Sequence, residues 1–362
     1  MFPCAPPLRT YPKERTIFGL WNGDRVVTQV TDSVLAGKVN TGGWAPPEGV
    51  VSPPLFVWPP RPVALLRWLF SVPGYLFPWN VFYIGTALLV WMFLIPEMAA
   101  MKTLEFGWIA RLFAINAALV FVFTSAWHVR LYTQRAQDVT FKFDEQWPKS
   151  NSSFLFGNQH FDNMIWTMLS AVPVMTAYLA VILWAMANGF VPYVEWADQP
   201  IYLGLVMLAT QVFRDVHFYC IHRLIHWPPL YRWIHSLHHK NSNPGPWSGL
   251  AMHPVEHVLY FSSLLIHWVV PSHPLLVLYH MVASAFGPSR DHCGFSSVVI
   301  GGKARIPAAS YMHYLHHRYF EVNYGDSITP IDRWFGTWHD GSRVAHAAMK
   351  RRMIRNKTRG AA

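Results

Sequence analysis

The chain has 362 residues, of which 52% are hydrophobic and only 13% carry a charge. Soluble domains usually contain about 25% charged residues, so this composition excludes an ordinary soluble domain and indicates a membrane protein. The net charge of +10 does not indicate a nucleic-acid-binding protein, because the basic residues are scattered and flank apolar stretches, as they do beside membrane spans.

Four apolar stretches have roughly the 20 residues that a helix needs to cross a bilayer. They comprise residues 75–95, 108–127, 164–186 and 201–219. The last stretch contains Gln211, Arg214 and Asp215, so we expect its final turns to lie in protein or at the membrane interface. Residues 75–200 are therefore predicted to be a transmembrane base, and the chain an all-α integral membrane protein with about four spans.

The distribution of basic residues predicts the orientation of these spans. Residues 1–74 form a polar segment with several Lys and Arg, and more basic residues lie between the second and third stretches. Residues 188–200 contain no Lys or Arg. Because cytoplasmic loops carry the excess of Lys and Arg, we expect residues 1–74 to be cytosolic. Four spans would then return the chain to the cytosol at the first histidine pair.

Two shorter apolar runs, residues 258–270 and 274–286, follow the fourth stretch. Each would be about 20 Å long as a helix, which is too short to cross a bilayer. Histidines lie on both sides of the two runs, so we expect a re-entrant or interfacial helical hairpin that returns to the same side. The alternative is a pair of ordinary buried helices in a cytosolic cap.

Histidines in short, repeated spacings dominate residues 201–340. Two clusters have the form His-x-x-His-His, beginning at His235 and His313, and His222 and His226 form a pair four residues apart. Positions i, i+3 and i+4 share one face of a helix, so each cluster can direct its three rings toward one point. Neutral imidazole is the commonest metal ligand among side chains. These spacings predict a cytosolic, helical, histidine-rich cap that holds more than one transition-metal ion.

The predicted ligands are the clustered histidines, together with a second pair four residues apart and one isolated histidine. They are His222, His226, His235, His238, His239, His253, His257, His292, His313, His316 and His317. Four acids near them are expected to accept the free ring N–H of ligands, with ion pairs to neighbouring arginines as the alternative. These acids are Asp215, Glu256, Asp291 and Asp332. The remaining histidines are expected to have structural roles, except His280, for which a role facing the site and a structural role both stay open.

The order of these motifs resembles the fatty acid hydroxylase superfamily, which includes sterol desaturases. Asp215-x3-Tyr219-x2-His222-Arg223-x2-His226 resembles its first histidine box, and His235-Ser-Leu-His238-His239 its second. His253-Pro-Val-Glu256 and His292-Cys-Gly-Phe295 are similar to two further elements, and the last box begins at His313. The resemblance covers roughly residues 201–340. In one departure, no acid follows His292-Cys-Gly, which leaves the substrate subclass open.

The resemblance implies a non-haem di-iron enzyme that uses O2 to hydroxylate or desaturate a lipid such as a sterol, fatty acyl or sphingolipid substrate. It implies two iron ions as cofactors and a separate electron donor, either a ferredoxin or a b-type cytochrome with its reductase. The basic tail, residues 341–362, could bind an acidic donor or anionic lipid headgroups. The alternatives are a membrane metal transporter or sensor, and a family member that has lost activity.

Overall fold

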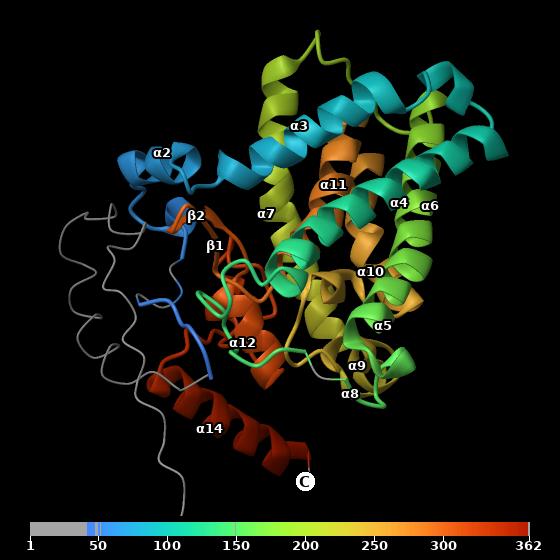
Figure 1. The fold of residues 1–362 in the computed structure, drawn as a ribbon. Helices are drawn as coiled ribbons and strands as arrows, with labels where there is room; N and C mark the ends of the chain where they lie inside the picture. Colours follow the sequence, from blue (N-terminus) through green and yellow to red (C-terminus); the bar gives the residue numbers. More distant parts are fainter. Residues whose placement is uncertain (1–41, 48–49, 51, 149, 361–362) are drawn as a thin grey trace, which may run out of the picture.

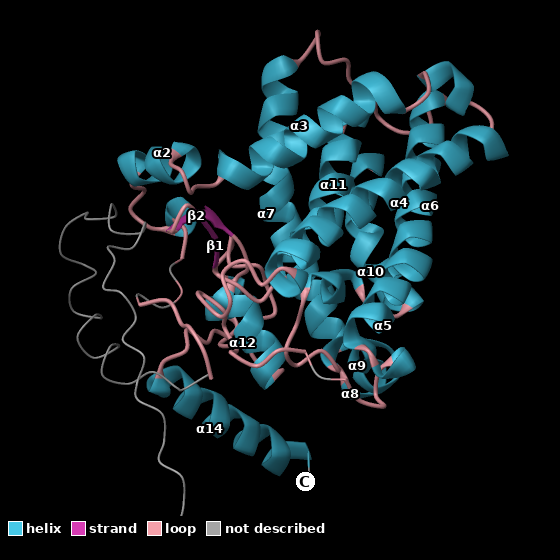
Figure 2. Cartoon of the chain, viewed as in Figure 1, coloured by secondary structure: helices cyan, strands magenta, loops and turns pink. Residues whose placement is uncertain are grey.

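The computed structural model describes residues 42–47, 50, 52–148 and 150–360, so much of the expected cytosolic segment 1–74 lies outside the described residues. Figure 1 shows a bundle of long helices that continues into a more irregular region, where shorter helices and loops gather. Figure 2 shows that helix predominates throughout, as the sequence predicts.

Three helical stretches are long and apolar enough to cross a membrane, and they confirm three of the four expected spans. Leu76–Leu94 joins η2 (Leu76–Asn80), α3 (Val81–Leu89) and η3 (Val90–Leu94). Phe106–Thr133 joins α4 (Phe106–His128) and η5 (Val129–Thr133). Gln159–Ala187 joins α5 (Gln159–Trp166), η7 (Thr167–Ala171) and α6 (Val172–Ala187). Short helices outside these stretches are η1 (Pro54–Phe56), α2 (Pro62–Phe70), η4 (Met98–Met101) and η6 (Leu155–Gly157).

The fourth expected span forms α7 (Pro200–Ile225), a helix of 26 residues that is not among these three. Its second half carries polar side chains that contact protein. Gln211 Nε2 donates to Tyr279 Oη at 2.8 Å, and Arg214 Nε donates to Ser284 Oγ at 3.0 Å. The final turns of α7 therefore lie against protein, as the polar residues predict, because such groups are costly in lipid.

The two short apolar runs form helices joined by a short connection. The first contains α10 (Pro254–Phe261) and η10 (Ser262–Trp268), and the second is α11 (Pro274–Asp291). Most side chains of α11 are buried, in one hydrophobic core with those of α3, α4 and α6. Tyr279 Oη of α11 also donates to Asn80 Oδ1 at 3.0 Å. Helix α11 thus lies inside the helix bundle, whereas its depth in a bilayer stays a prediction.

The histidine-bearing region is built from short helices, one hairpin and the longer C-terminal helix α14. The helices are α8 (Pro228–Leu230), η8 (Tyr231–His235), α9 (Ser236–His239), η9 (Pro246–Leu250), α12 (Tyr311–Tyr319), α13 (Ile331–Trp334) and α14 (Arg343–Gly360). Strands β1 (Ser297–Ile300) and β2 (Lys303–Pro307) pair antiparallel, a correction to the expected all-α fold. Their turn is Gly301-Gly302, and both residues have positive φ, as the tightest hairpin turns require.

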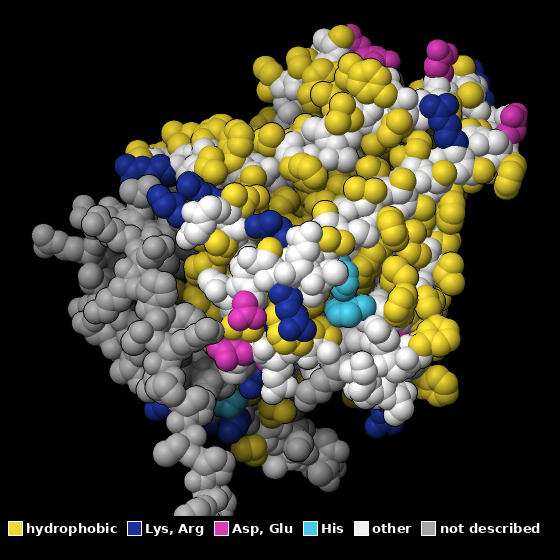
Figure 3. All heavy atoms as spheres, in the orientation of Figure 1, with side chains coloured by type: hydrophobic (Ala, Val, Ile, Leu, Met, Phe, Trp, Pro, Cys, Tyr) yellow, Lys and Arg dark blue, Asp and Glu magenta, His cyan; other side chains and the backbone are white. Residues whose placement is uncertain are grey.

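The surface of the molecule divides in the same way. Figure 3 shows hydrophobic side chains over the outer faces of α3, α4 and α6, with charged side chains at the loops that end this bundle and around the histidine-bearing region. Exposed apolar residues on the candidate spans include Met92, Phe93, Val122 and Leu169. Large exposed apolar surfaces mark sites of contact with membrane or protein, so lipid is the natural environment of this bundle.

Close packing of η9 against the end of α11 yields a test of the fold. A Cβ atom on Gly249 would lie 2.3 Å from the carbonyl carbon and oxygen of Pro288. Gly249→Ala should therefore force backbone apart and destabilise the protein by about 1–3 kcal/mol. Thermal unfolding in detergent measures this as a lower midpoint. Gly204→Ala on α7 is the control, because a Cβ there meets no atom within 4 Å; equal midpoints for the two variants would contradict the packing.

Candidate metal centre

Helix ends bring the clustered histidines together from four parts of the chain. His222 lies in the last turn of α7 and His226 directly follows it, whereas η8 and α9 carry the second box. His292 follows α11, and α12 carries the last box, with Ser310 Oγ accepting from the backbone N–H of His313 at the start of the helix. A histidine at the end of a helix is held by a rigid element but can still point out of the bundle.

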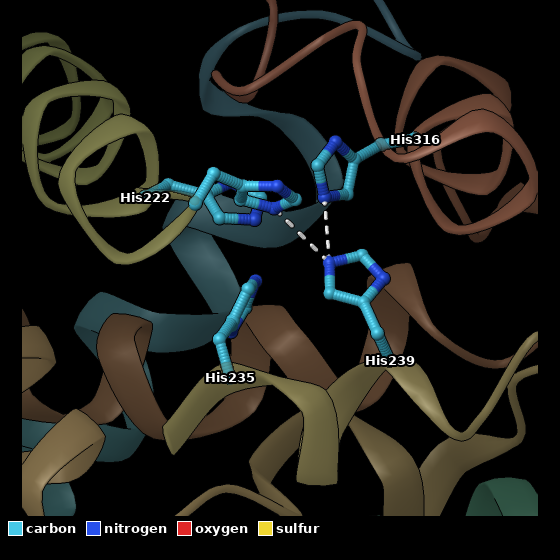
Figure 4. A group of neighbouring side chains, drawn as sticks. His222, His235, His239 and His316 are labelled. Atoms are coloured by element: carbon cyan, nitrogen blue, oxygen red, sulfur yellow. Dashed lines mark hydrogen bonds between the residues drawn. The ribbon is translucent and has the colours of Figure 1, made fainter. Parts of the chain in front are cut away.

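Five histidines form the first metal-binding group, which we call group 1: His222, His226, His235, His239 and His316. One ring nitrogen of each lies within 4.8 Å of one from every other member. His239 Nε2 is 3.2 Å from His226 Nε2 and 3.0 Å from His316 Nε2. Figure 4 shows the labelled rings of this group pointing toward one another from α7, the second box and α12. All but His226 are buried.

Four buried histidines form a second group, group 2: His238, His292, His313 and His317. His292 Nε2 lies at its centre, 3.2 Å from His238 Nε2, 3.0 Å from His313 Nε2 and 2.9 Å from His317 Nε2. The isolated histidine of the sequence thus meets members of both His-x-x-His-His clusters. Groups 1 and 2 are neighbours, because the ring centroids of His239 and His317 are 4.9 Å apart.

The rings of each His-x-x-His-His cluster divide between the two groups, so the expectation that all three meet at one point is wrong. His235 and His239 join group 1 while His238 joins group 2, and His313 and His317 join group 2 while His316 joins group 1. Residues i and i+4 point in nearly the same direction on a helix, whereas neighbours i+3 and i+4 diverge by about 100°. The same spacing therefore supplies both groups at once.

Backbone carbonyls select the ring nitrogen that faces the centre. Nδ1 of His222 donates to Tyr324 O at 2.8 Å and Nδ1 of His316 donates to Val322 O at 2.6 Å. Nδ1 of His292 donates to Pro288 O at 2.8 Å, and His238 Nδ1 is 3.4 Å from Ala251 O. A carbonyl can only accept, so these rings carry their proton on Nδ1 and an unprotonated lone pair on Nε2.

Ring nitrogens that face each other with lone pairs indicate whether these groups fit metal ions. His238 and His292 present unprotonated Nε2 atoms 3.2 Å apart, so neither can donate to the other. His235 Nε2 is buried and has no hydrogen-bond partner among the described residues. Burial lowers the pKa of His222 to about 3 and that of His238 to about 4, so both are neutral near pH 7. Converging neutral nitrogens of this kind fit a cation at each centre.

The structure places two of the expected ligands, His253 and His257, outside both groups. His257 contacts Ser170 Oγ through Nδ1 at 2.8 Å and Leu250 O through Nε2 at 3.1 Å, so protein occupies both ring nitrogens. His253 precedes α10, and its Nδ1 accepts from the backbone N–H of Val255 at 3.2 Å. Their spacing of four residues resembles that of a ligand pair, but only His257 lies within α10 itself.

The four acids named from the sequence take different positions. Glu256 contacts a histidine of group 1 directly, with Oε1 2.7 Å from His235 Nδ1. Asp332 accepts from the backbone N–H of Tyr324 at 2.9 Å, and the carbonyl of Tyr324 holds His222. Asp215 instead accepts from Thr329, through its N–H and its hydroxyl, and Asp291 pairs with Arg290, which was the alternative expected for these acids.

A cavity of about 270 Å³ adjoins both groups. Its wall includes His222 and His235 of group 1 and His238, His292 and His313 of group 2. Other parts of its wall come from α2, η2, α3 and the residue before η2, and no motif in the sequence predicts them: Trp68, Tyr75, Trp79, Asn80 and Tyr83. No motif marks these residues, because isolated aromatic and amide side chains are also common in ordinary packing.

Comparison with known proteins shows which family model and which relatives part of this chain is similar to. Residues 207–337 match the family model described as fatty acid hydroxylase. A Delta(7)-sterol 5(6)-desaturase of Gibberella zeae is 32% identical over 140 residues, which are 38% of this chain and 42% of that protein. A Delta(7)-sterol 5(6)-desaturase of Candida glabrata is 32% identical over 182 residues, 47% of each chain. Methylsterol monooxygenase 1 of Gallus gallus is 29% identical over 152 residues, 41% of this chain and 51% of that protein.

The chain spans about half of the length of these relatives. No solved structure matches it. The matched residues contain both metal-binding groups, and their range agrees with the extent of the resemblance seen in the motifs.

The contact between Glu256 and His235 can be tested through metal retention. Beside a bound cation, a Glu256 carboxylate would orient and polarise this ring. Glu256→Gln removes that charge, so metal affinity should fall about 10- to 100-fold. Elemental mass spectrometry after dialysis against graded chelator measures the loss. Glu195→Gln, at an exposed loop position, is the control. Unchanged retention in Glu256→Gln would mean that this carboxylate does not support the metal group.

Proposed function

We propose, from the membership of residues 207–337 in the fatty acid hydroxylase/sterol desaturase superfamily, that this protein is a membrane-bound, non-haem di-iron oxidoreductase. It would use O2 to hydroxylate or desaturate a lipid. The observation that carries the proposal is the pair of adjacent groups in which nine histidines turn their ring nitrogens inward.

Each group would hold one metal ion. Group 1 offers five nitrogens and group 2 offers four, which exceeds the three protein ligands and open position usual for catalytic zinc. Imidazole suits iron, copper, nickel and zinc alike, so the choice of iron rests on the superfamily. When bound, iron would supply the dioxygen chemistry that attacks an unactivated C–H bond, which protein side chains cannot do alone.

The protein's own residues would hold the metal ions and orient the substrate. Carbonyls of Tyr324, Val322 and Pro288 fix which nitrogen of three rings faces the centre, so these ligands need no rearrangement before metal binds. Glu256 does the same for His235. The cavity beside both groups would place one end of the substrate against the metals and keep bulk water away. No side chain is required as an acid or base in this proposal.

Lipid is the substrate class that the surroundings favour. The relatives are named for action on sterols, and the helices next to the cavity carry the exposed apolar side chains expected in a bilayer. A target carbon in a membrane lipid can reach a centre built at the ends of such helices. We infer a histidine site on the cytosolic side, from the basic flanks, and a separate electron donor of the ferredoxin or b-type cytochrome class.

One variant pair tests the assignment of ligands. His238→Ala removes a group 2 ligand and should lower metal content and abolish turnover, while the protein still inserts in the membrane. His346→Ala should retain metal and activity, because His346 lies on α14 and contacts the rings of Tyr319 and His339 instead. Full activity in His238→Ala, or loss of metal in His346→Ala, would contradict the assignment.

Metal analysis tests the function itself. Protein purified without oxygen should contain about two iron ions per chain and consume O2 only when both a reductant and a lipid substrate are present. The lipid product should gain one oxygen atom or lose two hydrogen atoms by mass spectrometry. One zinc ion per chain, or metal that varies with supply, would instead favour a transporter or sensor, and bound iron without turnover would favour an inactive family member.

A further inference from the structure

Besides the histidines, five residues of charged type belong to the wall of the cavity: Arg214, Glu256, Arg290, Asp291 and Asp326. Glu256 is held against His235, with Oε1 2.7 Å from Nδ1. Charged groups this close to the interior of a membrane protein are costly, and they usually mark a pathway or a binding site. Their pairing decides which of them remains available to a ligand.

Arg290 and Asp291 form a direct ion pair. Arg290 Nη2 donates to Asp291 Oδ1 at 2.8 Å and to Oδ2 at 3.0 Å, and its Nε donates to Oδ1 at 3.1 Å. The guanidinium carbon also lies 5.5 Å from the ring centroid of Trp79. The charge of Arg290 is therefore balanced by a carboxylate in direct contact, although the two N–H groups of its Nη1 have no hydrogen-bond partner among the described residues.

Arg214 differs, because no carboxylate oxygen among the described residues lies within 4.0 Å of it. It donates to Ser284 Oγ at 3.0 Å and Gln211 Oε1 at 2.5 Å, and its contact with Tyr260 Oη is long, at 3.4 Å. A guanidinium has five N–H donors, so at least two are unused within the described part of the chain.

Asp326 is the complementary group. Its backbone N–H donates to Asp215 Oδ1 at 2.5 Å, which fixes the loop that carries it. Within the described residues its own carboxylate accepts no hydrogen bond. Burial, together with the carboxylates of Asp291 and Asp215, raises the pKa of Asp326 to about 7. A donor placed beside this carboxylate would stabilise its charged form.

The charge balance of the cavity selects among ligands. The wall holds the carboxyl groups of Asp326 and Asp291 as well as the two arginines, so a ligand carboxylate or phosphate that approached Arg214 would also face these acids when they are ionised. A hydroxyl group can accept from Arg214 and donate to Asp326, which satisfies both. The unused donors and the unused acceptor therefore fit an uncharged alcohol better than an anion.

The size of the cavity sets how the ligand lies. Its volume of about 270 Å³ is at or below the small end of pockets that hold a whole drug-sized ligand, so only one end of a lipid fits. The same cavity touches five of the clustered histidines. A lipid that places its polar end here therefore also places the nearby carbons next to the metal groups.

We infer that Arg214 and Asp326 form a polar subsite that binds the hydroxyl group of a lipid alcohol, which enters polar end first and is oxidised at a carbon close to that hydroxyl. This inference rests on the proposed function for the oxidation, whereas the binding of the alcohol stands by itself. It makes Arg214 and Asp326 determinants of substrate specificity, distinct from the residues that hold metal.

The test measures binding without turnover. Metal-loaded protein in lipid nanodiscs is incubated, without reductant, with hexadecan-1-ol, its methyl ether and hexadecanoate, and in parallel with cholesterol and its methyl ether. Retained ligand is quantified by mass spectrometry against empty nanodiscs. In at least one of the two skeletons, the alcohol should be retained at least about tenfold over the matched ether, since the ether cannot donate to Asp326.

Variants separate this subsite from a merely structural role. Arg214→Met should remove the preference for the alcohol. Asp326→Asn should shift the preference toward hexadecanoate, because the charge of Arg214 is then uncompensated. Arg305→Gln and Asp198→Asn, at exposed positions, should behave as the unmodified protein. Thermal unfolding and metal content of each variant show whether it is folded and loaded.

Three outcomes would overturn the inference: equal retention of alcohol and ether in both skeletons, preference of the unmodified protein for hexadecanoate, or a preference that neither variant changes. Iron content is measured on the same samples. A preference for alcohol in protein that binds no iron would reject the proposed function and support the subsite. Two bound irons without that preference would support the proposed function and reject the subsite.

Discussion

The mutual repulsion of unprotonated nitrogens in a buried space is the constraint on which this structure depends. His238 and His292 turn lone pairs toward each other because carbonyls of Ala251 and Pro288 occupy their other nitrogens. Such an arrangement is unfavourable for the empty protein and favourable around a cation. The helix ends, the carbonyl positions and the packing that supports them all serve to hold these nitrogens close.

That constraint explains why the bundle contains polar side chains at its centre. Helix α11 ends at the metal groups, so its position along the neighbouring helices must be fixed. Apolar packing alone specifies this position weakly, whereas hydrogen bonds between helices specify it. Tyr279 links Gln211 of α7 to Asn80, and Thr124 of α4 contacts Ser289 at 3.0 Å. Interhelical hydrogen bonds stabilise membrane bundles modestly but specify how the helices align.

The sequence alone predicts the chemistry of the centre and the class of fold. Spacings of three and four residues are sufficient for this, since local helix geometry decides which side chains share a face. The spacing of the histidines between His222 and His317 therefore predicts a site for more than one metal ion, and the apolar stretches predict membrane spans. The same spacing rule predicts His253 and His257 as metal ligands, but the structure places them outside both groups. A pair of histidines four residues apart can also cap a helix or form hydrogen bonds with protein.

Only the tertiary structure decides which rings meet. Helix geometry separates His238 from His239, and His316 from His317. Which ring of one cluster joins which ring of the other depends on where α9 and α12 lie relative to α7, and no local pattern contains that information. The cavity is a second case, since its wall includes Trp68, a residue more than 150 positions before the second box. The physical reason is the same in both: ligand type is a property of residues, whereas convergence is a property of long-range packing.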